Sequence, residues 1–178
     1  MDKDREPLFQ MEGYKVKGLR LEEDIKDVLK LCESCLDYYE LEGVKSIDIQ
    51  TAKEIFEVLP LGKKNEDKMV IGIYDEDDTL IGIIEGLREY PQKDIWYIGL
   101  MMIAKNKRKQ GIGEKSYKAF EKWASKYNVN SIRLGVLEKN TIGLGFWEKV
   151  GFRIIKKIDN FEIGNTKTTV FSMENNLN

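Results

Sequence analysis

A short basic segment followed by two glycines is the part of the sequence best suited to hold an anion. Its residues are, in order, Lys105, Lys107, Arg108, Lys109, Gly111 and Gly113. Backbone N–H groups at the start of a helix are unpaired and lie at the positive end of the helix dipole. Glycines let an anion come close because they carry no Cβ atom. Since an amphipathic helix is expected to begin at Gly113, the segment predicts a phosphate or pyrophosphate site.

Three loop patterns compete for this segment. The phosphate-binding loop GxxxxGK[ST] is excluded because Glu114 separates Gly113 from Lys115. The dinucleotide-binding pattern GxGxxG is excluded because Ser116 stands where its third glycine belongs. Residues 108–113 satisfy the third pattern, Arg-x-x-Gly-x-Gly. That pattern resembles the acetyl-CoA loop of the GCN5-related N-acetyltransferase (GNAT) superfamily.

Two further motifs at the family's spacing support this resemblance. One combines an Asn, a later aromatic residue and a Gly-Phe pair, which here are Asn140, Trp147, Gly151 and Phe152. The other consists of two apolar positions before the basic loop, and Met101 and Ile103 occupy them. The three motifs occur in the family's order, and the resemblance spans roughly residues 14–174.

The spacing of apolar residues predicts the elements that position these motifs. We expect strands at 14–19, 68–74, 80–88, 95–103, 131–137, 152–158 and 168–173, and helices at 22–36, 51–60, 113–127 and 140–149. This order predicts a mixed α/β (α+β) chain. It is similar to the GNAT-like acyl-CoA N-acyltransferase fold. The resemblance implies a twisted, mostly antiparallel mixed sheet, splayed between strands 4 and 5 and flanked by helices.

The composition favours one soluble domain. The chain has 178 residues, of which 42% are hydrophobic and 34% charged, and this is typical of a globular protein with a full core. We expect an N-terminal arm at 1–13 and a single acetyltransferase domain at 14–178. Short apolar runs and a charged N-terminus favour a cytoplasmic protein with no membrane partner. The net charge of −2 disfavours a nucleic-acid partner.

Charge is nevertheless unevenly distributed along the chain. Residues 21–60 contain eleven acids and four bases, a local net charge of −7. Residues 101–126 contain two acids and eight bases, a local net charge of +6. Solvated helix faces would explain both segments. An anionic cofactor at one end and a cationic substrate at the other would explain them equally well.

The resemblance implies acetyl-CoA as a cosubstrate and no metal. The Met101 N–H would face the thioester carbonyl as an oxyanion donor, and the main chain at Ile103 would pair with the pantetheine arm. The Asn140 amide would bind that arm too, although a helix N-cap would also account for Asn140. The implied cofactor-binding residues are Met101, Met102, Ile103, Arg108, Lys109, Gln110, Gly111, Ile112, Gly113, Glu114, Asn140 and Trp147.

The catalytic residues of the family are not retained here. Many members protonate the thiolate with a tyrosine at the position of Trp147, and an indole N–H does not titrate usefully. Histone-modifying members have a glutamate at the position of Tyr97. Glu85 is an isolated acid in an apolar strand, and a hairpin would pair it near Gly99, on the face of Tyr97 and Met101. We therefore take Glu85, Tyr97 and the Met101 N–H as candidate catalytic groups. One alternative is that Glu85 is solvated at a sheet edge or paired with a nearby Arg. Another is water-mediated deprotonation with no dedicated base.

The acceptor side is expected in the loop at 37–46. In this family the corresponding loop commonly lines the substrate pocket, so we take Tyr38, Tyr39 and Glu40 as candidate substrate-binding residues. Together with Glu42 they would favour an amine-bearing acceptor. Exposed acids are common in loops, however, and this would account for the same residues.

Four small residues need an interpretation of their own. Cys32 and Cys35 lie on the apolar stripe of the first expected helix, and the chain has no other Cys or any His. A zinc site would need two more ligands, so we interpret the pair as core packing. Gly143 and Gly145 lie inside an expected helix, where each costs about 1 kcal/mol relative to Ala. Tight packing or close approach of the cofactor would each explain them.

We therefore expect an acetyl-CoA-dependent N-acetyltransferase. A primary amine, more plausibly of a small molecule than of a protein or peptide, would attack the thioester directly in a ternary complex. A CoA-binding regulatory or interaction protein with little catalysis is the first alternative. A protein that binds ATP or NAD with the same loop is the second. A homodimer is compatible with the family.

Overall fold

The computed structural model describes residues 6–163 and 166–177. Its strands are β1 (Lys15–Gly18), β2 (Lys68–Tyr74), β3 (Leu80–Leu87), β4 (Ile95–Ile103), β5 (Ser131–Leu137), β6 (Arg153–Ile163) and β7 (Thr166–Asn176). Its α-helices are α1 (Leu21–Ser34), α2 (Leu36–Tyr39), α3 (Ile49–Glu57), α4 (Ile112–Ala124) and α5 (Thr141–Lys149). Single 3-10 turns are η1 (Glu40–Glu42), η2 (Asn65–Asp67), η3 (Lys105–Lys107) and η4 (Ser125–Tyr127). Within these ranges no helix has the length and apolarity to span a membrane.

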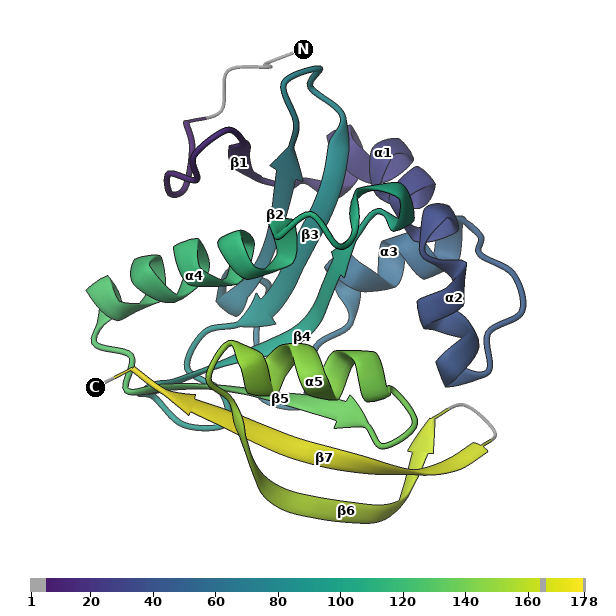
Figure 1. Cartoon of the computed structure of the whole chain (residues 1–178), viewed down its shortest axis with the longest axis vertical. Helices are drawn as coiled ribbons and strands as arrows, with labels where there is room; N and C mark the ends of the chain where they lie inside the picture. Colours follow the sequence, from purple (N-terminus) through teal and green to yellow (C-terminus); the bar gives the residue numbers. More distant parts are fainter. Residues whose placement is uncertain (1–5, 164–165, 178) are drawn as a thin grey trace.

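The described strands form one seven-stranded sheet between two layers of helices. Its order is β1-β2-β3-β4-β5-β7-β6, and only β4 and β5 are parallel neighbours. Helices α4 and α5 cover one face, and α1 and α3 cover the other (Figure 1). One core cluster includes Trp96 and Phe120, and the second includes Val28 and Ile83. The expected mixed α/β fold with a mostly antiparallel sheet is confirmed.

The expected opening between the fourth and fifth strands is present. β4 and β5 pair only from Ile95 to Ile98 and from Ser131 to Leu134. Both strands continue beyond these pairs, and Figure 1 shows their ends pointing apart. The first residues past the last pair are Gly99 and Gly135, and both are exposed. The opening therefore begins between two glycine backbones.

A bulge in β4 changes the register that regular alternation predicts. Glu85 pairs with Leu100 and Gly86 pairs with Ile98, so Gly99 is an extra residue. An extra residue shifts the alternation, so the side chain of Met101 packs on the α4/α5 face and that of Leu100 on the other. The expectation that Met101 shares a face with Glu85 is wrong for this reason.

Several element boundaries also differ from the sequence-based expectations. Helix α3 begins at Ile49, two residues before the expected start, and is capped by Asp48, whose Oδ1 accepts from the Thr51 N–H at 3.0 Å. The expected loop at 37–46 contains most of α2 and all of η1. The last two strands are longer than expected because they pair with each other almost to the tip of their hairpin. Residues 164–165 lie outside the described residues.

The described part of the expected N-terminal arm, 6–13, packs against the fold. Phe9 is 8% exposed, and its ring centroid lies 5.4 Å from that of Trp123 and 6.4 Å from that of Phe120. Met11 is also buried in the α4-side core. Residues 1–5 lie outside the described residues. Residues 6–13 thus add apolar contacts to the helix that follows the glycine loop.

We expect Phe9→Ala to lower the free energy of unfolding by about 3 kcal/mol, because it removes a buried ring and leaves a cavity. Leu8→Ala is the matched control. Leu8 is 38% exposed, and its truncation should cost about 0.5 kcal/mol. Urea unfolding of both variants measures the difference. Equal losses would mean that the Phe9 ring is not packed in the core.

Candidate active site

The start of α4 presents a row of free backbone donors. Gly111 caps the helix with φ +78°, a left-handed conformation that suits glycine. In the described part of the chain, the backbone N–H groups of residues 109–114 have no hydrogen-bond acceptor. Lys109, Gln110 and Gly111 are exposed, whereas Ile112 is buried and anchors the turn. These groups can bind an anion from solvent, as expected for a pyrophosphate.

The side chain of Arg108 is turned away from these donors. Its guanidinium forms two hydrogen bonds with Asp37, NH1 to Oδ2 at 2.6 Å and NH2 to Oδ1 at 3.2 Å. Its Nε donates to the Ile103 carbonyl at 2.9 Å. Arg108 holds the pKa of Asp37 below its usual value by this hydrogen bonding. The guanidinium expected at the cofactor is therefore occupied by protein groups.

The start of α5 lies on the other side of the opening. Asn140 caps this helix, and its Oδ1 accepts from the Gly143 N–H at 2.9 Å. A Cβ atom at Gly143 would lie 2.8 Å from Asn140 Cγ, so Gly143 makes room for the cap. Around Gly145, by contrast, nothing lies within 4 Å of a Cβ position. Gly145 therefore leaves open space on α5.

Trp147 belongs to the core. It is 9% exposed and packs edge-to-face against Tyr117, Phe146 and Phe152, with ring centroids 4.9–5.6 Å apart. Phe146 also lies over Gly113, where a Cβ would come within 3.3 Å of its ring. This aromatic packing joins α5 to the start of α4 and accounts for Trp147 without a cofactor contact.

Among the three residues expected to bind the substrate, only Tyr38 is partly exposed and also forms a side-chain hydrogen bond. Its hydroxyl donates to Glu42 Oε1 at 3.3 Å. Tyr39 is 7% exposed, and its hydroxyl donates to the Cys32 sulfur, so the structure places it in the core. Glu40 is exposed. Glu42 is half-buried, and burial raises its pKa although the Tyr38 hydroxyl opposes this.

Glu85 and Tyr97 meet at the mouth of the opening. A Cβ at Gly99 would collide with Oε2 of Glu85, and one at Gly135 would lie 3.1 Å from the Tyr97 hydroxyl. The two glycines thus let a carboxylate and a phenol lie over the strand backbones. Burial raises the pKa of Tyr97, and the neighbouring Tyr90 and Glu85 add to the shift. The phenol therefore stays protonated at neutral pH.

Glu85 is ion-paired with a residue that the sequence did not point to. Lys68 Nζ lies 2.8 Å from Glu85 Oε1, and the two side chains are 6% and 12% exposed. Burial raises the pKa of Glu85, and the Lys68 charge acts in the opposite direction. Lys68 Nζ also donates to the Val58 carbonyl at 2.6 Å. Glu85 is therefore ion-paired, but its partner is a lysine and not the expected arginine.

The cysteine pair is packed in the core, as expected. Both thiols are free and buried, and Cys35 Sγ contacts the Ile103 carbonyl at 3.5 Å. Within the described ranges, no cluster of three or more His, Cys, Asp or Glu side chains is suited to a metal ion.

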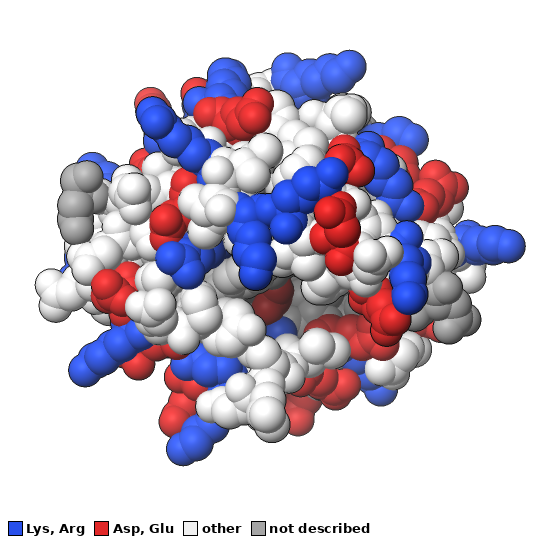
Figure 2. All heavy atoms as spheres, turned by 90° about the horizontal axis from the view of Figure 1, so that it is seen from below, with Lys and Arg blue, Asp and Glu red and all other residues white. Residues whose placement is uncertain are grey.

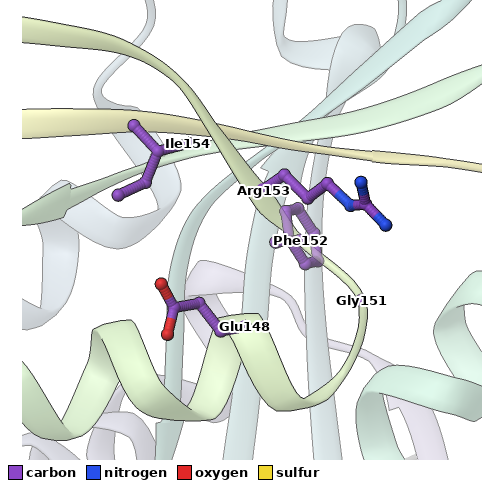
Figure 3. Close-up of a pocket in the computed structure, with 5 residues that line it drawn as sticks. All are labelled: Glu148, Gly151, Phe152, Arg153 and Ile154. Atoms are coloured by element: carbon purple, nitrogen blue, oxygen red, sulfur yellow. The ribbon is translucent and has the colours of Figure 1, made fainter.

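The surface has a hollow with acidic side chains and a separate depression. From the end where β6 and β7 lie, the molecule is hollowed near its middle, and acidic side chains lie inside the hollow and along one edge (Figure 2). A separate depression of about 390 Å³ lies between α5 and β6, lined by Glu148, Gly151, Phe152, Arg153 and Ile154. There Glu148 and Ile154 lie on one side and Arg153 points away (Figure 3). None of these residues belongs to the opening.

Comparison with known proteins places the chain in a family. A family model described as the acetyltransferase (GNAT) family matches residues 30–152. The chain belongs to the GNAT family. Members of this family use acetyl-CoA, so the free donors at the start of α4 and the opening beside β4 in this GNAT protein fit a CoA molecule. No protein of curated function matches the sequence.

Solved structures share the fold of this GNAT protein at low sequence identity. Spermidine N-acetyltransferase from Vibrio cholerae, in complex with CoA and spermine, has a TM-score of 0.72 and 15% identity, covering 93% of this chain and 96% of that chain. An acetyltransferase from Thermus thermophilus has a TM-score of 0.72 and 15% identity, covering 91% and 97%. The ribosomal-protein-S18-alanine N-acetyltransferase from Escherichia coli has a TM-score of 0.65 and 12% identity, covering 92% and 94%. At these identities the likeness shows the fold alone.

Asn140 allows helix capping to be separated from cofactor binding. We expect Asn140→Ala to lower the free energy of unfolding by about 1 kcal/mol, because it removes the cap, whereas Asn140→Asp keeps the accepting oxygen and the stability. If the Nδ2 group also binds CoA, Asn140→Asp should bind CoA roughly tenfold more weakly, because it loses that donor. Urea unfolding and calorimetric titration with CoA measure the two effects. If Asn140→Asp binds CoA with wild-type affinity, Asn140 caps α5 and does not bind the cofactor.

Proposed function

We propose that this protein is an acetyl-CoA-dependent N-acetyltransferase that acetylates a primary amine of a small cationic molecule. The observation that carries this proposal is the pairing of two features around one opening. Free N–H groups suited to a pyrophosphate lie at the start of α4, and the carboxylate of Glu85 lies over Gly99 at the mouth of the opening. One feature fits the donor, and the other fits an amine.

The donor half of the proposed site is built mainly from main chain. Residues 109–114 would hold the pyrophosphate through their N–H groups. Among the described residues β4 has no strand partner on its β5 side after Ile98, so its main chain from Met101 to Ile103 can pair with the amides of the pantetheine arm. The Met101 N–H would then donate to the thioester carbonyl. Asn140 would bind the arm from the α5 side of the opening.

The acceptor half would be built from acidic and phenolic side chains. The neutral amine attacks the thioester carbon, the C–N bond forms, the C–S bond breaks, and CoA leaves as a thiolate. Glu85 would take the proton that the amine loses, directly or through a water. Tyr97 stays protonated and would donate to the thiolate. Glu42 and the Tyr38 hydroxyl would attract the cationic acceptor.

An amine acceptor is also supported by one of the similar structures, which is a spermidine N-acetyltransferase in complex with CoA and spermine. The S18-alanine N-acetyltransferase is similar as well, so a protein amine is the runner-up acceptor. A binding protein with little catalysis is the rival from another class. Its support is Trp147, a core residue at the position where many family members have a tyrosine acid.

The deciding experiment measures release of free CoA from acetyl-CoA with a panel of diamines, polyamines, amino sugars and amino-acid amines. We expect turnover above the hydrolysis background with at least one cationic amine. Titration with acetyl-CoA, ATP and NAD in parallel separates the rivals. Tight acetyl-CoA binding without turnover on any amine would support the binding protein. Equal affinity for ATP or NAD would support a nucleotide-binding protein.

The Lys68–Glu85 pair predicts a pH dependence that can be measured. If Glu85 is the base, kcat/KM rises with pH as Glu85 loses its proton, and its pKa is above the ordinary value. Lys68→Met removes the charge that lowers this pKa. The acid limb of the kcat/KM profile, where kcat/KM rises with pH, should therefore move to higher pH by about 1 unit. Lys68→Arg should keep the wild-type limb, and Glu85→Gln should abolish it.

Lys64→Met is the matched control, because Lys64 is an exposed lysine paired with Glu66 at 3.9 Å. It removes the same charge from the same segment and should leave the acid limb in place. The same amine is used throughout, so that its own titration cancels. An unchanged limb in both Lys68→Met and Glu85→Gln would remove Glu85 from the mechanism.

A further inference from the structure

Arg108 uses three of its five N–H donors in hydrogen bonds on the acceptor side of the protein. Its Nε bonds the Ile103 carbonyl, and its two terminal nitrogens bond both oxygens of Asp37. The side chains of Arg108 and Asp37 are 33% and 37% exposed. A bidentate pair between guanidinium and carboxylate is among the stronger and more directional hydrogen-bonded contacts. Asp37 lies in the first turn of α2, next to Tyr38.

Helix α2 needs such a contact from outside. It has four residues, and its N-cap residue, Cys35, forms no side-chain capping hydrogen bond. A helix of one turn has too few internal hydrogen bonds to be stable alone. The Ile103 carbonyl accepts from both Arg108 Nε and Cys35 Sγ, so one atom at the end of β4 joins the basic loop to the α1–α2 junction.

We propose that Arg108 is a positioning residue for the acceptor half of the site and does not bind the phosphates of the cofactor. Through Asp37 it holds α2 against the end of β4, and thereby holds Tyr38 and its partner Glu42 at the opening. The free N–H groups of residues 109–114 follow it in the chain and bind the pyrophosphate without its guanidinium. The proposal rests on the proposed function for the identity of the two halves.

Three variants separate positioning from phosphate binding. Asp37→Asn, Arg108→Gln and the double variant are compared by hydrogen–deuterium exchange of residues 36–44 and by calorimetric titration with CoA. We expect both single variants to raise exchange in 36–44 roughly tenfold, and the double variant to equal the single ones, because all three break the same pair. CoA affinity should change by less than about threefold, since no phosphate contact is lost.

Asp27→Asn is the matched control. Asp27 is an exposed acid on α1 that pairs with Lys30 at 3.4 Å, and its change should leave both exchange and CoA affinity at wild-type values. Thermal unfolding of each variant ensures that a change in exchange is local. Where an amine is turned over, its KM should rise in Asp37→Asn and Arg108→Gln alike.

The opposite pattern would overturn the proposal. CoA affinity that falls tenfold or more in Arg108→Gln, but not in Asp37→Asn, would make Arg108 a phosphate ligand. If residues 36–44 exchange at the wild-type rate in both single variants, Arg108 has no positioning role. Exchange and CoA titration need no turnover. If no amine is acetylated while the exchange and CoA titration results are as expected, the proposed function fails and the positioning role of Arg108 stands.

Discussion

The site depends on the point at which β4 and β5 stop pairing. Their parallel ladder ends at Ile98 and Leu134, and an exposed glycine follows on each strand. Beyond it, one side of each strand has no neighbouring strand in the described part of the chain, and main-chain polar groups there need a partner. A chain with its own amides, such as pantetheine, can supply one. Gly99 and Gly135 also leave room for the Glu85 carboxylate and the Tyr97 hydroxyl, so the same interruption shapes both halves of the proposed site.

The proposed donor half could be assigned from the sequence because its residues are close together in the chain. The glycine turn, the helix start and the preceding apolar strand lie within residues 95–116, and the proposed contacts to the cofactor there are mainly made by backbone groups. Short-range spacing is therefore enough to recognise them. The strands β2 and β5 were predicted at their observed bounds for the same reason. Asn140 was recognised by spacing too, and its capping bond to Gly143 spans three residues.

The acceptor half was not predictable in the same way, because long-range contacts build it. Asp37 and Arg108 are 71 residues apart in the chain, and nothing near either residue indicates the other. Lys68 of β2 pairs with Glu85 of β3. In the sequence Lys68 is only a charged residue at the start of a strand, which is common and does not indicate an ion pair. The β4 bulge adds one residue that alternation does not show. Tyr39 was misplaced because a hydroxyl near acids looks exposed in the sequence, although it packs on Cys32.

Glu85 shows how the fold sets the chemistry at the acceptor end. Burial favours its neutral form, and the charge of Lys68 favours the carboxylate. A base must be ionised before the reaction and must still hold a proton well afterwards, so it needs a pKa near the working pH. A buried carboxyl alone would stay neutral too readily, and an exposed one would hold a proton poorly. Because Lys68 also binds the Val58 carbonyl, the segment after α3 takes part in this balance. The proposed donor site thus rests on one short motif, while the proposed acceptor chemistry requires β2, β3 and β4 to be assembled.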